Sequence, residues 1–199
     1  MTILRRSGLA AFLLGLATFG GGRAESAFVT YTETVVGSGT LGSSSFSNVL
    51  VTFTQTADTN NVISGFFTSV ADLTSTVNVA GIGTASFTGT TFTAVQPGIG
   101  LGLGLGTAGV GGPIILATIN PALFSYGLRS SIGPVTGTAN VNAAMSFLTT
   151  LGTLRFTSTA ATATFQANVV PEPSSLALCG VSGLLGLGYL KARRRMAGR

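Results

Sequence analysis

Apolar and polar residues alternate one by one along two stretches of the chain, residues 135–143 and residues 161–169. In both, alanine, valine, glycine or phenylalanine fills every second position, and threonine, asparagine or glutamine fills the positions between. Successive side chains of a β-strand point to opposite faces of the sheet. This period of two therefore predicts strands with one buried face.

Similar but shorter segments are spread over the middle of the chain. Val49, Val51 and Phe53 repeat the pattern, and residues 57–61 (Ala-Asp-Thr-Asn-Asn) form a predicted turn after them. Further strand candidates are residues 28–36, 62–70, 84–94, 114–119, 123–128 and 148–156. About eight short strands without helical periodicity or a fixed repeat predict an all-β domain, an antiparallel β-sandwich or a similar arrangement.

The glycine-rich residues 97–109 contain a partial match to a dinucleotide-binding fingerprint at Gly104, Gly106 and Gly109. That fingerprint needs a βαβ unit and an acidic residue for the ribose hydroxyl. No acidic residue lies between Asp72 and Glu172, so the match is assigned to chance. The segment is predicted to be a flexible loop or a glycine-rich edge segment, and no cofactor is predicted.

The formal net charge of +5 comes from the two ends of the chain. The charged residues from position 25 to position 170 are Glu25, Glu33, Asp58, Asp72, Arg129 and Arg155. A domain with two positive and four negative residues has no basic patch for phosphates, which argues against nucleic-acid binding.

Few residues in this middle part can do chemistry. The chain has no histidine, and the segment 25–168 has neither cysteine nor lysine. This removes the usual bases, zinc ligands and covalent nucleophiles, so we predict that the protein is not an enzyme and holds no metal. Asp58 and Asp72 could form a glycosidase pair, but both lie in or near predicted turns, where solvated side chains are expected. Asp58-Thr59-Asn60 is a fragment of a calcium loop without the following glycine and the distant glutamate.

Threonines recur at every second position in six places: 30–32–34, 52–54–56, 74–76, 91–93, 157–159 and 162–164. On a strand, such residues present hydroxyls on the same face at intervals of roughly 6.6 Å. An ordered array of this kind could bind ice. The pairs fall at irregular intervals, however, and threonine is also a common solvent-facing strand residue.

The first 24 residues are typical of an export signal. Arg5 and Arg6 precede an apolar, glycine-rich run, and residues 22–24 (Gly-Arg-Ala) offer small residues for cleavage after Ala24. The run is shorter than the roughly 20 apolar residues of a membrane span. We therefore expect the protein to be exported through the general secretion machinery.

The end of the chain combines a proline pair, an apolar run and a basic cluster. Residues 174–190 carry no charge and would extend ~25 Å as a helix, enough to cross a bilayer core at its short limit. The membrane stop consists of Lys191, Arg193, Arg194 and Arg195, which would hold that end in the cytoplasm. Pro171 and Pro173 prevent the helix from starting earlier and leave an extended element outside the membrane.

Residues 170–174 (Val-Pro-Glu-Pro-Ser), the apolar run and Arg193-Arg194-Arg195 together resemble the PEP-CTERM sorting signal of Gram-negative bacteria. The resemblance covers only about the last thirty residues. It implies that Pro171, Glu172 and Pro173 are recognised by an exosortase, a membrane protease that cuts the tail. Released proteins of this family are often associated with extracellular polysaccharide and biofilm matrix, and the resemblance implies the same for this chain. A permanently anchored protein remains the alternative at this point.

We therefore predict three parts: a signal peptide (1–24), an exported β domain (25–168) and a sorting tail (169–199) with one C-terminal transmembrane helix. The predicted function is that of a secreted, non-catalytic surface or matrix protein, first anchored in the inner membrane and then released. Its predicted partners are the export machinery, exosortase, the membrane and exopolysaccharide, with self-association through exposed strand edges. The alternatives are an ice- or carbohydrate-binding module, or a polysaccharide hydrolase.

Overall fold

The computed structural model describes residues 28–170, apart from residues 98–99, 107 and 110–111. Strands form most of this part, and every pair of neighbouring strands is antiparallel. The prediction of an all-β domain is confirmed.

The strands are β1 (Phe28–Leu41), β2 (Ser44–Asp58), β3 (Thr68–Val79), β4 (Gly83–Ser86), β5 (Thr91–Gln96), β6 (Gly100–Leu105), β7 (Ile114–Ile119), β8 (Ile132–Val141), β9 (Phe147–Thr149) and β10 (Gly152–Val170). Two short 3-10 helices interrupt them, η1 (Thr59–Asn61) and η2 (Pro121–Leu123). Asp58 caps η1 by accepting a hydrogen bond from the Asn60 amide, so the predicted turn at 57–61 is a capped 3-10 turn.

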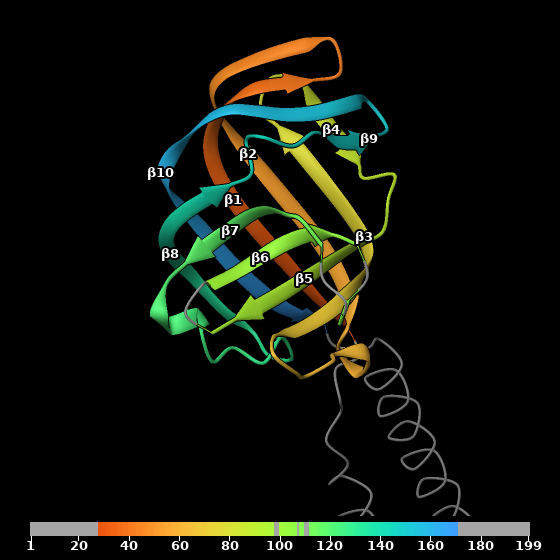
Figure 1. Ribbon diagram of the computed structural model, residues 1–199, viewed down its shortest axis with the longest axis vertical. Coiled ribbons are helices and arrows are strands. Elements are labelled where there is room, and N and C mark those ends of the chain that lie inside the picture. Colours follow the sequence, from red (N-terminus) through yellow and green to blue (C-terminus); the bar gives the residue numbers. More distant parts are fainter. Residues whose placement is uncertain (1–27, 98–99, 107, 110–111, 171–199) are drawn as a thin grey trace, which may run out of the picture. The chain divides into compact units, whose positions relative to one another are not determined.

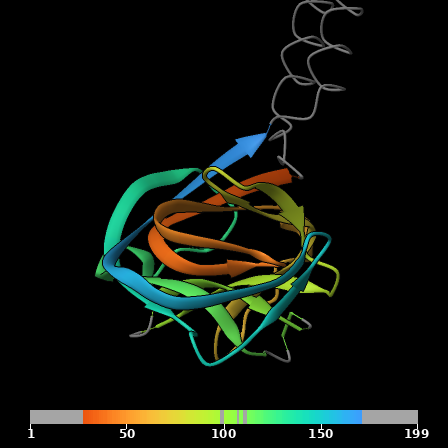
Figure 2. The same cartoon turned by 90° about the horizontal axis from the view of Figure 1, so that it is seen from above.

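The sheet closes on itself into an eight-strand barrel, in the order β1, β2, β3, β5, β6, β7, β8 and β10. β1 closes the ring because it pairs with β2 along one edge and with β10 along the other. Figure 1 shows β5, β6 and β7 crossing in front of β1 and β2, and Figure 2 shows the strands curving around a common interior. The predicted sandwich is therefore wrong, since one continuous wall replaces two separate sheets.

The barrel interior is filled by side chains, as expected for eight strands. Along β1 the burial alternates without a break, with odd-numbered residues buried from Val29 to Leu41. Two apolar clusters occupy the interior. One includes Phe53, Phe147 and Phe156, and the other includes Tyr31 and Phe165.

The glycine-rich segment forms a strand of the barrel wall, contrary to the prediction of a loop or an edge. β6 alternates buried Leu101 and Leu103 with Gly100, Gly102 and Gly104. A Cβ on Gly102 would lie 2.6 Å from the Leu116 carbonyl oxygen of β7. Glycine therefore allows β7 to approach closely, which explains its presence inside a strand.

The prediction of a strand over residues 123–128 is also wrong, because η2 and an irregular connection occupy this region. Leu123 and Leu128 are fully buried against one end of the interior. Both side chains pack into the core from a connection outside the sheet. A short apolar run in the sequence fits such a connection as well as it fits a strand.

Barrel closure also removes the long exposed edges that were predicted to drive self-association. The strands outside the ring are β4, which pairs with β3, and β9, which pairs with β10. The two approach each other, because a bridge joins Phe87 to Thr149 and the Thr150 amide donates to the Ser86 carbonyl at 2.9 Å.

The signal peptide with its cleavage at Ala24, the motif Pro171-Glu172-Pro173 and the basic residues Lys191, Arg193, Arg194 and Arg195 lie outside the described residues. So does the predicted membrane helix 174–190. Within residues 28–170, no helix is long and apolar enough to cross a bilayer.

Candidate functional site

Threonines that are scattered in the sequence form one continuous surface on the outside of the barrel. From Thr30 to Thr34 on β1 and from Thr52 to Thr56 on β2, the outward positions are threonines opposite one another, and β10 and β3 continue the pattern on either side. The next outward pairs of the β1–β2 ladder, Phe28 with Asp58 and Val36 with Leu50, bound the pattern. We call this surface the threonine face. Its three rows, read from β10 through β1 and β2 to β3, are Thr164, Thr34, Thr52 and Asn78; Gln166, Thr32, Thr54 and Thr76; and Asn168, Thr30, Thr56 and Thr74.

Hydrogen bonds tie neighbouring side chains of this face together. Thr136 of β8 extends the first row, and its hydroxyl lies 2.9 Å from that of Thr164. At the other end of the same row, the Asn78 amide nitrogen donates to the Thr84 hydroxyl of β4 at 2.7 Å. The two bonds hold the ends of the first row, and no member of the three rows carries a charge.

A second group of polar side chains lies inside the barrel. Glu33, Gln55 and Thr118 are each at most 1% exposed, and Asp72 also points inward. On β1, β2 and β3, respectively, Glu33, Gln55 and Asp72 lie between a member of one apolar cluster and a member of the other. We call this group the interior polar layer; its further members are Ser75, Thr91 and Thr93.

Both carboxyl groups of this layer are held in environments that favour the neutral form. Desolvation raises the pKa of Glu33 from 4.5 to about 8, although the Thr118 hydroxyl donates to its Oε1 at 2.6 Å and opposes the shift. Desolvation likewise raises the pKa of Asp72 from 3.8 to about 7, against hydrogen bonds from Thr91 and Thr93. The basic side chains of the described part do not compensate them, because Arg129 donates to the Val62 carbonyl and Arg155 is exposed.

Three buried atoms of the layer have no hydrogen-bond partner: Gln55 Nε2, Asp72 Oδ2 and Ser75 Oγ. Gln55 faces Ser75 directly across the β2–β3 ladder, and the next inward pair is Ala57 with Asp72. Cross-strand neighbours of this kind have Cβ atoms roughly 5 Å apart. The three atoms therefore belong to one patch of the inner wall, and their lack of partners adds to the cost of burying this layer.

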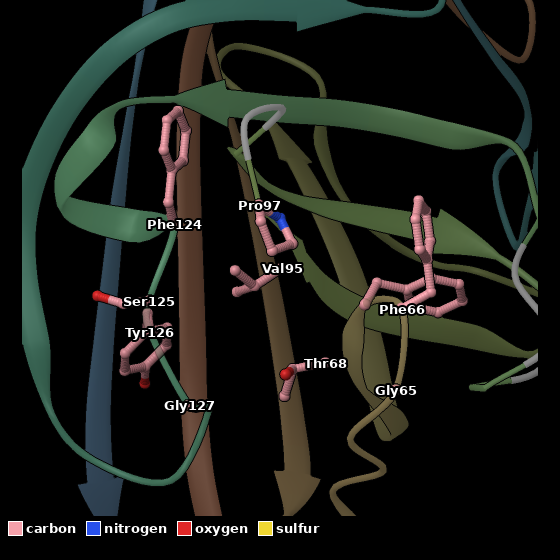
Figure 3. Close-up of a pocket in the computed structure, with 10 residues that line it drawn as sticks. Gly65, Phe66, Thr68, Val95, Pro97, Phe124, Ser125, Tyr126 and Gly127 are labelled. Carbon is pink, nitrogen blue, oxygen red and sulfur yellow. The ribbon is translucent and has the colours of Figure 1, made fainter.

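A shallow pocket of about 110 Å³ lies outside the barrel, beside the start of β3 and the end of β5. Figure 3 shows Phe66 on one side of it, Phe124 and Tyr126 on the other, and Val95 and Pro97 between. Phe66 is 82% exposed, and the Tyr126 hydroxyl donates to the Ser130 carbonyl. The residues that line the pocket bear no charge, so the pocket offers apolar contact without acid or base chemistry.

No protein-family model, no curated protein and no solved structure matches this chain.

The two predicted glycosidase candidates do not come together. Asp72 points into the barrel and accepts a hydrogen bond from the Thr93 hydroxyl at 2.9 Å. Asp58 lies at the end of β2 and accepts a hydrogen bond from the Asn60 backbone amide. Asp72 pairs with Ala57, so Asp58, one residue further along β2, lies on the other side of the wall. Among residues 28–170, no group of three His, Cys, Asp or Glu side chains could hold a metal ion.

The sequence interpretation missed Glu33, although it shares the odd-numbered face of β1 with Val29, Tyr31 and Val35. It identified the Thr-x-Thr sets that make up the threonine face, but their spacing along the chain does not show that they share one surface. The rows of this face depend on strand register, and the register joins residues more than 100 positions apart.

Proposed function

We propose that this protein is exported, sorted through its C-terminal tail by an exosortase, and released as a non-catalytic component of the cell surface or extracellular matrix. The observation that carries the proposal is the sequence Pro171-Glu172-Pro173, followed by an uncharged run and the basic residues 193–195. Exosortase recognition would act on Pro171, Glu172 and Pro173 as substrate features, while Lys191 and the arginines stop transfer through the membrane.

The barrel supports a binding or structural role for the exported part. Its carboxyl groups at Glu33 and Asp72 are directed inward, and the charged residues of positions 28–170 are few. Because the tail resembles a PEP-CTERM sorting signal, we propose exopolysaccharide as the matrix component with which the released protein associates.

The experiment that tests sorting is the intact mass and cell fractionation of this protein from cells with and without an exosortase. Loss of the residues after the Pro-Glu-Pro motif, with release only when the protease is present, would support the proposal. A full-length tail in both strains would contradict it and would identify a permanent anchor.

Replacing both Pro171 and Pro173 with alanine should prevent cleavage. Proline blocks helix formation whereas alanine favours it, so alanine at both positions would let the predicted membrane helix start earlier and would hide the motif. We expect the variant to keep its full mass and to stay in the membrane fraction of exosortase-positive cells. The control is Ser175→Ala, in the same tail beyond the motif, which should be cleaved as the natural protein is; equal cleavage of both variants would remove the motif's proposed role.

A further inference from the structure

We propose that the threonine face binds the surface of ice crystals. This inference goes beyond the proposed function, because it concerns the wall of the barrel and would hold whether or not the tail is cleaved. It depends on the geometry of the three rows, on the stiffness of their side chains and on the absence of charge.

The geometry of the face is a two-dimensional grid. Neighbouring strands are ~4.8 Å apart, and every second residue of a strand repeats after ~6.8 Å. Thr32 lies at the centre of this grid, with Thr30 and Thr34 along β1 and with Thr54 and Gln166 across it. Register therefore converts an irregular spacing in the sequence into a regular spacing of hydroxyl groups, which is what a crystalline partner requires.

The side chains of the grid are held stiffly. Threonine is β-branched and has restricted χ1 freedom, so its hydroxyl and methyl positions are set by the backbone. β1 and β2 are paired on both edges within a closed barrel, which fixes that backbone. Hydrogen bonds within the face fix it further, as between the Thr136 and Thr164 hydroxyls. Little conformational entropy is left to lose on binding.

The chemistry of the grid fits ordered water better than it fits other partners. A threonine hydroxyl can donate one hydrogen bond and accept two, while its methyl group offers no polar contact. The Thr34 and Thr76 hydroxyls donate to the carbonyls of Thr164 and Thr54, at 3.5 and 3.4 Å, and can still accept hydrogen bonds from water. The rows contain threonine, asparagine and glutamine, without a charged side chain to organise its own hydration and without an aromatic ring to stack on a sugar. Water molecules bridged to such a grid would occupy repeating positions.

The opposite wall of the barrel provides an internal comparison. On β6 the outward positions are Gly100, Gly102 and Gly104, which offer no side chain. Beside them, Phe92 and Ala94 form a small apolar cluster with Ala108. That wall lacks a hydroxyl grid, so ice binding is assigned to the threonine face alone within the described part of the barrel.

The test is inhibition of ice recrystallisation by the full chain in a mild non-ionic detergent, with the detergent buffer as the blank. We expect ice grains to stay small in the presence of the protein and to coarsen in the blank. Thr32→Lys places a long charged side chain at the centre of the grid and should raise the concentration for half-inhibition by about tenfold or more, as for loss of a central contact. Thr157→Lys makes the same change at an exposed position of β10 outside the rows and should have no effect.

Circular dichroism and melting temperature establish that both variants are folded. Grains that coarsen as fast with the protein as with the blank would overturn the proposal, as would equal loss of inhibition in two folded variants. Retention on an insoluble polysaccharide that Thr32→Lys abolishes, without any effect on ice, would assign the face to carbohydrate instead. Sedimentation of a self-associated species that Thr32→Lys dissociates, again without an effect on ice, would assign it to a second copy of the chain.

Discussion

Raising the pH from about 5 to about 8 should destabilise the barrel by several kcal/mol, and Glu33→Gln should remove much of this loss. In the unfolded chain Glu33 releases its proton near its ordinary pKa of 4.5, whereas in the barrel it keeps the proton until about pH 8. Between these values the native state binds more protons than the unfolded state, so the free energy of unfolding falls as the pH rises. The ionisation of Glu33 therefore costs no stability below pH 4.5, and its cost stops growing above about pH 8.

Asp72 adds to the same effect in a slightly lower range, between its ordinary pKa of 3.8 and about 7. Tyr31 and Tyr126 lie near these groups, and burial raises the pKa of both further above the usual range of tyrosine, so they stay neutral in this window. Urea unfolding at several pH values measures the slope of the free energy of unfolding against pH. Glu33→Gln keeps an acceptor for the Thr118 hydroxyl and is neutral at every pH, so it should be more stable than the natural protein at pH 8.

Two further variants separate this cause from a general effect of net charge. Asp72→Asn should also flatten the slope, and its combination with Glu33→Gln should nearly abolish it. Thr118→Val removes the side-chain hydrogen bond that lowers the pKa of Glu33, so the loss of stability should extend to higher pH and become larger in total. The natural slope should survive high salt, because buried charges are screened much less than surface charges. A slope that salt removes, or that Glu33→Gln leaves unchanged, would contradict the interior polar layer as its source.

The local strand pattern was readable from the sequence because one face of each strand is buried. The alternation over residues 135–143 and 161–169 corresponds to β8 and β10, and residues 114–119 are β7. The same alternation places Glu33 on the buried face of β1, although glutamate is rarely fully buried in proteins. At Glu33 the strand pattern and the chemistry of the side chain therefore conflict, because burial of an uncompensated carboxyl is costly.

Closure of the barrel was not readable, because it depends on pairing between distant segments. β1 meets β10 through pairs such as Thr34 with Thr164, and no local feature specifies that contact. The threonine face follows from this register and from that of β2 with β3. The strand β6 was hidden for a different reason. Its glycines disfavour a strand when taken alone, and only the close approach of β7 explains them.

Gly39→Ala should destabilise the protein by about 3 kcal/mol or more. Gly39 lies where the ladder between β1 and β10 shifts its register, and it pairs with Phe156. A Cβ at this position would lie 2.0 Å from the Arg155 carbonyl oxygen and 3.0 Å from the Phe156 Cα. Both are backbone atoms of the neighbouring strand, so a rotamer change cannot relieve the contact. The strands must separate at the end of the barrel where Phe156 packs against Phe46.

Thermal unfolding measures this effect, with an expected fall in melting temperature of roughly 10 °C. Gly89→Ala is the matched control, because a Cβ there meets no atom within 4 Å. It should leave the melting temperature unchanged or raise it slightly by restricting the unfolded chain. A Gly39→Ala protein that melts within a few degrees of the Gly89→Ala protein would show that β1 and β10 do not approach this closely. Because β1 and β10 close the ring, that result would also call into question the register on which the threonine face depends.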